Sequence, residues 1–254
     1  MSGTIVLDVD GVLLLGSEPI EGSAAALPRL AAAGFRLIVA TNNATRSPQQ
    51  AADRIERSLG YRFEPGCVVT STVAVAMMLG AGDQPVLAAA EEGMAITLRE
   101  HGIEVTGDAR NANTVVVGLD RSFTYDKLTA AADAVRGGAR FVASNRDFTF
   151  PIRGGAAPGA GALVAAIEAA SGVTAEVAGK PHEPMRRAVT RCLADGPVWM
   201  VGDRPETDIA FGAAAGWTTV LTLSGVIADP AAVPEGLTPD LVVGSLADLP
   251  DVLA

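Results

Sequence analysis

Hydrophobic runs separated by glycine, proline and polar residues recur along this chain in a pattern typical of α/β proteins. The run over residues 4–8 is continuously apolar until Asp8, as expected of a strand buried on both faces of a parallel sheet. Further strand-like runs follow, and helical segments lie between most of them: 35–40, 67–70, 86–89, 115–119, 140–143, 197–201 and 218–223. This alternation predicts an α/β fold with crossover helices, and not a sandwich or a helical bundle.

Two early helices carry local signals. Residues 23–33 form the first candidate, which Gly34 ends, although Pro28 predicts a break or a late start within it. The second begins with Ser47 as N-cap and Pro48 in the first turn, has Gln50 in the reciprocal capping position, and ends at Gly60.

Glycine-rich segments at 79–82 and 176–179 bracket about 100 residues, which is enough for an inserted domain. We therefore predict a discontinuous core domain, residues 1–78 and 179–254, and an inserted α/β domain, residues 79–178. Internal repeats are not evident.

Composition, net charge and cysteine content exclude several classes of function. The chain has 254 residues, 49% apolar and 19% charged, which is typical of a folded globular protein. Its net charge of −10 includes no basic block, so we expect no nucleic-acid partner. Cys67 and Cys192 are too few for a disulfide framework or a CxxC metal site, which favours a reducing cytoplasm. We expect neither an export signal nor a membrane span.

The first chemical signal is a pair of carboxylates at the end of the first strand. Asp8 and Asp10 lie where open parallel sheets bind their ligands, at the carboxyl end of a strand. Two like charges at this spacing call for a cation or a shared proton. A solvated turn is the alternative interpretation.

Polar groups also follow the second strand. Thr41, Asn42 and Asn43 supply hydroxyl and amide donors suited to an oxyanion, although these residues are also common in turns. Lys180 stands between glycine and proline, where its ammonium can reach a phosphate, but most lysines are simply exposed at the surface. It is no Walker lysine, since Pro181 replaces the required Ser or Thr.

The last segment is an apolar strand that runs into an acidic loop. Asp203 directly follows strand and glycine, and Asp208 lies five residues later. Thr207 is a candidate helix N-cap, which gives the Thr207–Asp208 pair a structural alternative. Together the four segments suit phosphoryl transfer: carboxylates and a substrate phosphate hold Mg²⁺, and an aspartate attacks phosphorus.

In this order, the four segments resemble the haloacid dehalogenase superfamily of aspartate-dependent phosphohydrolases. The segments 117–120, 123–128, 144–147 and 158–163 resemble the class IIA cap of NagD-type and p-nitrophenyl phosphatase-like enzymes. The resemblance implies a Rossmann-like, three-layer parallel-sheet core with an inserted α/β (C2) cap at 79–178.

The resemblance also implies residue roles. Asp8 would be the nucleophile and a magnesium ligand, and Asp10 the general acid and base, with its backbone carbonyl on the metal. Asp203 would bind Mg²⁺ directly and Asp208 through water. The transferred phosphoryl group would be held by four residues: Thr41, Asn42, Asn43 and Lys180.

The cap would select the leaving group, and Asn145 and Asp147 lie in a region of it that resembles a specificity segment. The alternative is that these two are ordinary polar turn residues.

Residues 86–93 depart from the family pattern, which often has a glycine at the end of the first cap strand. His101 and His182 are expected to be surface or turn residues. The resemblance also implies a homodimer formed through the cap.

We therefore predict a cytoplasmic, magnesium-dependent phosphatase of small soluble phosphate monoesters. The alternatives are a phosphotransferase, or a phosphoryl-binding or receiver module with the same acidic pocket. The sequence leaves the ester open among sugar phosphates, glycerol phosphate, phosphoglycolate, nucleotides and pyridoxal phosphate, because cap side chains decide between them.

Overall fold

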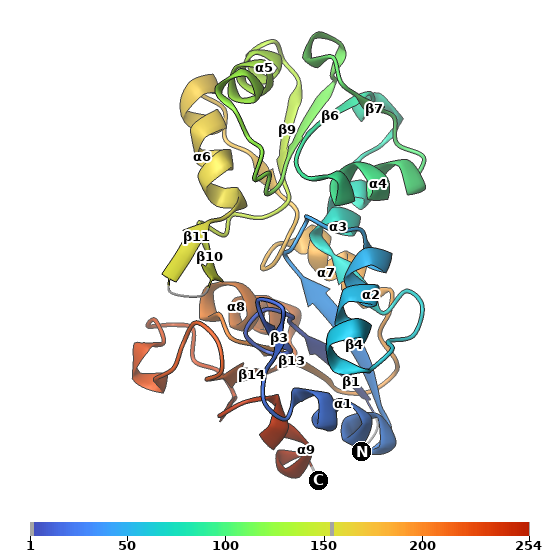
Figure 1. The fold of residues 1–254 in the computed structure, drawn as a ribbon, viewed down its shortest axis with the longest axis vertical. Helices are drawn as coiled ribbons and strands as arrows, with labels where there is room; N and C mark the ends of the chain where they lie inside the picture. The colour runs from blue at the N-terminus through green and yellow to red at the C-terminus, as the bar shows by residue number, and fades with distance from the viewer. Residues whose placement is uncertain (1–2, 153–154, 254) are drawn as a thin grey trace.

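The computed structural model describes residues 3–152 and 155–253, and its elements form two lobes, each built around a parallel sheet (Figure 1). The lower lobe holds a six-stranded sheet in the order β15-β14-β13-β1-β4-β5. Its strands are β1 (Gly3–Leu7), β4 (Phe35–Thr41), β5 (Val68–Thr70), β13 (Val198–Gly202), β14 (Thr218–Thr222) and β15 (Leu241–Val243).

All six strands run parallel, and β1 pairs with β4 on one side and β13 on the other. The chain order therefore reverses at β1, and a crevice at the carboxyl end of this strand is where such sheets bind ligands. Every residue of β1 is buried, which explains its continuous apolar run.

Helices and short elements complete this lobe. The helices are α1 (Ser23–Ala32), α2 (Pro48–Leu59), α3 (Ser71–Met78), α7 (Glu183–Thr190), α8 (Ala210–Ala215) and α9 (Leu249–Val252). The short elements are β2 (Leu14–Leu15), β3 (Glu18–Pro19), η3 (Pro205–Ile209), η4 (Pro230–Ala232) and η5 (Leu246–Asp248).

The upper lobe contains a second parallel sheet in the order β12-β9-β8-β6-β7 and an antiparallel hairpin that lies between the lobes (Figure 1). Its sheet strands are β6 (Val86–Ala89), β7 (Val105–Thr106), β8 (Thr114–Val117), β9 (Arg140–Ala143) and β12 (Glu176–Val177). The hairpin consists of β10 (Thr149–Ile152) and β11 (Gly155–Pro158). The helical elements are α4 (Glu92–Glu100), α5 (Tyr125–Arg136), α6 (Ala160–Ser171), η1 (Ala81–Asp83) and η2 (Ala109–Asn111).

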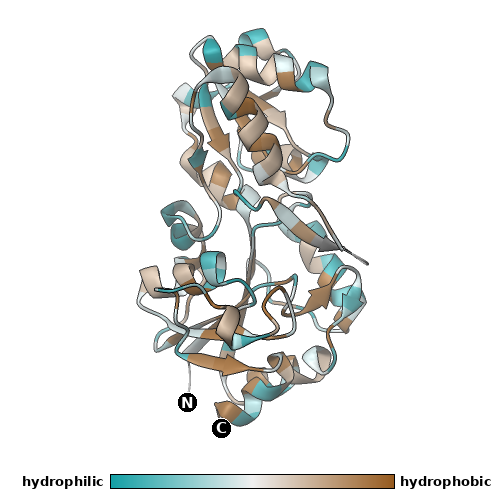
Figure 2. Ribbon diagram, turned by 90° about the vertical axis from the view of Figure 1, so that its left-hand side faces the viewer, coloured by the Kyte–Doolittle hydropathy of each residue, from teal (hydrophilic) through white to brown (hydrophobic). Residues whose placement is uncertain are grey.

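The α/β fold class predicted from the sequence is confirmed. Hydrophobic residues concentrate on the strands of both lobes, and hydrophilic residues on the outer faces of the helices (Figure 2). The larger apolar core continues from the lower lobe through α3 into the upper lobe. There it includes Met94 and Leu98 of α4 and Val116 of β8. The five strands of the upper sheet fall within 79–178, while the proposed domain boundaries at 78/79 and 178/179 remain a prediction.

Two local expectations had different outcomes. The second helix has the predicted capping box, with Ser47 and Gln50 bonded reciprocally and Gly60 at the C-cap. The break expected at Pro28 is wrong, because α1 runs from Ser23 to Ala32 through the proline. Leu27 and Leu30 are fully buried on either side of Pro28, and this packing opposes the loss of one backbone hydrogen bond.

Ser47→Ala tests the stabilising role of the capping box. The Ser47 hydroxyl accepts a hydrogen bond from the Gln50 backbone N–H at 3.3 Å, and its loss should lower the free energy of unfolding by about 1 kcal/mol. Urea denaturation measures this change. Gln49→Ala on the exposed face of the same helix is the control; an equal effect of both substitutions would contradict the capping argument.

Candidate active site

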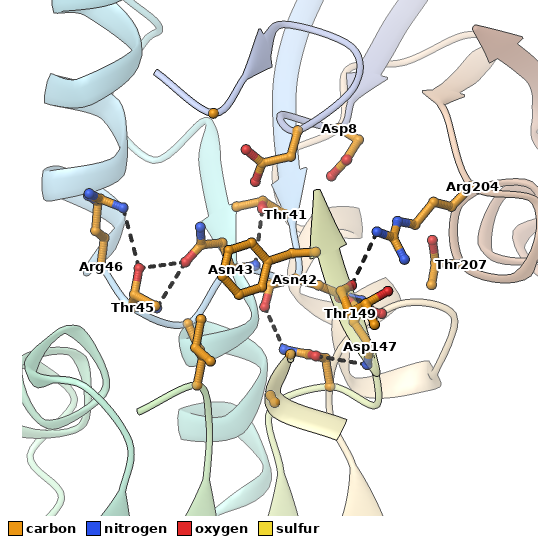
Figure 3. A pocket seen from close by; sticks show the side chains of 18 of the residues that line it. Asp8, Thr41, Asn42, Asn43, Thr45, Arg46, Asp147, Thr149, Arg204 and Thr207 are labelled. Atoms are coloured by element: carbon orange, nitrogen blue, oxygen red, sulfur yellow. Dashed lines mark hydrogen bonds between the residues drawn. The ribbon is translucent and has the colours of Figure 1, made fainter. Parts of the chain in front are cut away.

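The carboxyl end of the core sheet and the adjacent hairpin enclose a pocket of about 640 Å³. Both lobes line it, and the sequence-predicted residues among its lining are Asp8, Asp10, Thr41, Asn42, Asn43, Asn145, Asp147 and Lys180. Figure 3 shows Asp8 and Thr41 facing Asn42 and Asn43, with Asp147 and Thr149 approaching from the hairpin side. Strand-end residues about 170 positions apart in sequence therefore meet in one cavity, as the parallel topology requires.

A buried ion-pair cluster lies beside this pocket. The Lys180 ammonium donates to Asp8 Oδ1 at 2.7 Å and to Asp208 Oδ1 at 2.6 Å. Asp8, Asp203 and Asp208 each offer a carboxylate oxygen, and these oxygens lie within 4.8 Å of one another. The cluster holds three carboxyl groups and one ammonium in a site almost without solvent contact, so full ionisation would leave two negative charges uncompensated, which is costly there.

Burial and the neighbouring charges shift the pKa values of the cluster. Burial raises the pKa of Asp8 well above its ordinary value, Lys180 opposes the shift, and Asp208 and Asp203 add to it. Burial is also the main reason that the pKa of Asp203 rises to about 7, with a further contribution from Asp208. The two neighbouring carboxylates raise the pKa of Lys180 despite its burial, so the lysine remains a cation.

The cluster has the chemistry of a divalent-cation site. Oδ2 of Asp203 accepts the Val226 backbone N–H at 2.8 Å, whereas buried Oδ1 has no hydrogen-bond partner within the described residues. Three hard carboxyl oxygen ligands with only one ammonium to balance them fit a metal such as Mg²⁺ or Ca²⁺, which would stabilise their ionised forms.

Glycines make room for these carboxylates. A Cβ at Gly11 or Gly225 would overlap the Asp203 side chain, and one at Gly202 would overlap Asp208. Gly11 also has a φ of 93°, in the left-handed region that favours glycine. The glycine that follows Asp10 thus turns the chain and lets Asp203 approach it closely.

Asp10 faces the pocket under different constraints. Its pKa is raised by burial, and Arg54, Asn43 and Arg46 oppose the shift. The Arg54 guanidinium lies 3.9 Å from Asp10 Oδ1. The two aspartates of the motif therefore occupy distinct environments: Asp8 contacts Lys180, and Asp10 faces arginines.

Asn42 connects three segments through its amide. Its Oδ1 accepts the Lys180 backbone N–H at 2.8 Å, and its Nδ2 donates to the Lys180 carbonyl at 3.2 Å and to Asp147 at 3.3 Å. The amide predicted to hold an oxyanion is thus bonded to the lysine loop and to the hairpin. Asn145 Nδ2 donates to the Asn42 carbonyl at 2.8 Å, so both predicted cap residues contact the core at this strand end.

The π-helical turn η3 places Asp208. Thr207 makes no capping bond, so its predicted N-cap role is wrong; it lines the pocket instead. Asp208 Oδ2 accepts the Arg204 backbone N–H at 3.1 Å, while Oδ1 receives the Lys180 ammonium. A carboxylate that stabilises this turn therefore also holds the lysine.

Sequence reasoning missed the arginines of the pocket, namely Arg46, Arg54, Arg121 and Arg204. Arg46 and Arg204 lie within four residues of a recognised motif, which was a usable signal. Arg54 projects from a helix and Arg121 from a cap loop, and neither position is marked by the sequence. The histidines behave as expected: His101 Nδ1 contacts the Thr97 carbonyl and His182 occupies the N-cap position of α7.

Comparisons with known proteins identify the family of the chain. Residues 5–104 match the family described as haloacid dehalogenase-like hydrolase, and residues 177–249 match a HAD-hydrolase-like family. Chronophin from Rattus norvegicus is 38% identical over 96% of this chain and 86% of its own. The p-nitrophenyl phosphatase from Archaeoglobus fulgidus is 32% identical with a TM-score of 0.89, covering 98% of both chains.

A glycerol phosphate phosphatase from Mycobacterium tuberculosis, solved in complex with magnesium, is 31% identical with a TM-score of 0.87, over 97% of this chain and 76% of that one. The chain therefore belongs to the haloacid dehalogenase superfamily, as a capped phosphatase of class IIA. It is a phosphoric monoester hydrolase, and its acidic cluster fits a divalent metal.

In the described part of the chain, no helix is long and apolar enough to cross a membrane.

The raised pKa of Asp203 predicts a pH-dependent stability. The ordinary value is 3.8 and the folded value about 7, so between these pH values the folded protein binds this proton more tightly than the unfolded chain. The stabilisation is therefore complete below about pH 4, is lost as the pH rises to about 7, and does not change above it.

Urea denaturation in chelator, from pH 4 to 8, should show this loss as a difference between the wild type and Asp203→Asn. The free energy of unfolding of the wild type should fall relative to the variant by on the order of 4 kcal/mol across the window, at about 1.4 kcal/mol for each unit of difference between the two pKa values. Asp195→Asn, at an exposed aspartate, controls for overall charge. Parallel profiles for the wild type and Asp203→Asn would rule out the assigned titration.

Proposed function

We propose that this protein hydrolyses small phosphate monoesters with Mg²⁺, through a phosphorylated aspartate. The observation that carries the proposal is the buried cluster of Asp8, Asp203, Asp208 and Lys180, in which three carboxyl groups share one ammonium beside the pocket. A magnesium ion would balance this charge and align the phosphoryl group with the attacking carboxylate. The donor set supports such an ion, because Asp203 Oδ1 is buried without a hydrogen-bond partner among residues 3–152 and 155–253.

In the first step, an oxygen of Asp8 attacks phosphorus while the ester P–O bond breaks. Asp10 gives its proton to the departing oxygen, and its raised pKa suits a group that must be protonated beforehand. The products of this step are the free alcohol and an aspartyl phosphate on Asp8. Lys180 offers a fixed positive charge on the Asp8 side of the pocket, where negative charge accumulates.

In the second step, water attacks the phosphorus of the aspartyl phosphate. Asp10, now ionised, accepts a proton from this water, and the bond between phosphorus and Asp8 breaks to release inorganic phosphate. Thr41 and Asn43 line the pocket and contribute donors to the phosphoryl oxygens. Asn42 contributes by holding the Lys180 backbone in place, since its amide is already bonded there.

Asp8→Asn should lower phosphate release from p-nitrophenyl phosphate by at least about 10³-fold, because an amide is a poor nucleophile towards phosphorus. The measurement is inorganic phosphate release with excess Mg²⁺, and circular dichroism verifies folding. Asp195→Asn, an exposed aspartate of the same lobe, should leave the rate within about twofold of the wild type. A folded Asp8→Asn variant with wild-type turnover would refute the nucleophile assignment.

Metal dependence is tested separately on the wild type. Chelator should abolish turnover and added Mg²⁺ should restore it, since the excess charge of the cluster otherwise opposes a phosphate dianion. Activity that is unaffected by exhaustive chelation would contradict the magnesium proposal. Competing alcohols in the same assay separate hydrolysis from phosphotransfer, because only a phosphotransferase produces a new phosphate ester.

A further inference from the structure

The pocket contains more positive charge than phosphoryl transfer alone accounts for. Its lining includes one lysine and four arginines: Lys180, Arg46, Arg54, Arg121 and Arg204. Asp8 and Lys180 belong to the ion-pair cluster, and the other acidic residues of the lining are Asp10, Glu18 and Asp147. The arginines differ in how far their charge is already paired.

Three of them have defined partners. Arg121 forms a two-pronged ion pair with Glu91, at 2.6 and 2.8 Å. Arg204 donates to the Thr149 carbonyl at 3.2 Å and faces Asp147. Arg54 donates to the Gly16 carbonyl and lies 3.9 Å from Asp10.

Arg46 is different. Its only side-chain hydrogen bond within the described residues goes to the Thr45 hydroxyl at 3.3 Å, and no carboxylate there lies within ion-pair distance. Arg46 is half-buried, and burial together with Arg54 and Arg121 lowers its pKa, while Glu91 and Asp10 oppose the shift. An anion placed beside Arg46 would relieve this repulsion.

The backbone of Arg46 is fixed by both lobes. It follows β4 and precedes α2, and Gly93 of α4 packs so closely that a Cβ at position 93 would overlap the Arg46 backbone. Figure 3 shows Arg46 on the opposite side of the pocket from Arg204, next to Thr45 and Asn43. The fixed backbone keeps the guanidinium on this side of the pocket, and the planar guanidinium can bind an anion through two hydrogen bonds.

The side of the pocket on which Arg46 lies is also chemically defined. Asp10 protonates the departing oxygen in the proposed reaction, so the leaving group lies towards Asp10. Arg54 and Arg46 are the cations on the Asp10 side, because both line the pocket and a small adjoining hollow together with Asp10, and the Arg54 guanidinium lies 3.9 Å from Asp10 Oδ1. They therefore face the leaving group, while Lys180 remains with Asp8 and the phosphoryl group.

We infer that the leaving-group side of the pocket is an anion subsite, in which Arg46 binds a second anionic group, a carboxylate or a phosphate, carried by the substrate. This inference rests on the proposed function, and it narrows the substrates of the enzyme to phosphate esters that carry a second anionic group. Arg54 and Arg121 add to the field at this subsite without being its principal ligands, since each already has another partner. Esters of neutral polyols lack the group that Arg46 recognises.

Matched substrate pairs test the subsite in the wild-type protein. 3-Phosphoglycerate and glycerol 3-phosphate differ by a carboxylate in place of a hydroxymethyl group, so the ratio of their kcat/KM values reports on the carboxylate. Fructose 1,6-bisphosphate against fructose 6-phosphate tests a second phosphate. We expect at least one anionic member to be preferred by about tenfold or more, and the preference to shrink when NaCl rises from about 0.02 to about 0.3 M.

Substitutions then assign the preference to Arg46. Arg46→Gln should reduce the ratio for the preferred pair by about tenfold, whereas Arg46→Lys should retain part of it because the charge remains. Arg62→Gln, at an exposed arginine paired with Glu56, is the matched control and should leave the ratio unchanged. Circular dichroism checks that each variant is folded.

A wild-type ratio near one for both pairs would overturn the inference, and so would a ratio that Arg46→Gln leaves intact. If Arg46→Gln does not fold, the wild-type kcat/KM ratios and their salt dependence still decide whether the pocket has an anion subsite. Hydrolysis of p-nitrophenyl phosphate by the wild type keeps the two proposals separate. Turnover without anion preference refutes the subsite alone, and absence of turnover on every ester refutes the proposed function.

Discussion

The ion pair that Lys180 forms with Asp8 and Asp208 is the interaction on which the catalytic side of this molecule depends. Bringing three carboxylates together in a buried site is unfavourable, and one ammonium offsets only part of the charge. The surrounding structure is built to maintain this arrangement. Gly11, Gly202 and Gly225 leave the space that the carboxylates fill, and the Asn42 amide holds the lysine backbone at both its N–H and its carbonyl.

The parallel sheet explains why such distant residues meet. Because β1 lies between β4 and β13, the chain order reverses at its carboxyl end, and three strand ends present their polar residues to one crevice. The residual negative charge then favours a divalent cation. The packing of the buried apolar strands thus maintains a cluster of carboxyl groups that is itself unfavourable.

The core of the fold and most of the site could be predicted from the sequence because their signals are local. A continuous apolar run predicted β1 as a buried strand, and Ser47, Pro48 and Gln50 fixed the start of α2. The carboxylates follow their strands directly, so the topology alone brings Asp8 and Asp203 together. The break predicted at Pro28 was wrong because the burial of Leu27 and Leu30 outweighs the tendency of proline to interrupt a helix. This burial depends on tertiary packing, which a local signal does not report.

The parts that could not be predicted depend on side-chain direction across long sequence separations. Arg54 and Arg121 occupy ordinary positions on a helix and in a loop. They line the pocket only because the two lobes are assembled around it. Thr207 had the right residue type for a cap, but it lies inside the π-helical turn, and the carboxylate of Asp208 accepts the Arg204 backbone N–H at the start of this turn instead.

The Asn42 amide has a consequence for engineering. One side chain joins the Lys180 loop to Asp147, which precedes the hairpin, so the segment that lines the upper side of the pocket also supports the buried lysine. A cap transplanted from another enzyme to change selectivity would therefore have to retain a carboxylate at position 147. Recombination points for such chimaeras are best placed so that residues 42, 147 and 180 come from the same parent.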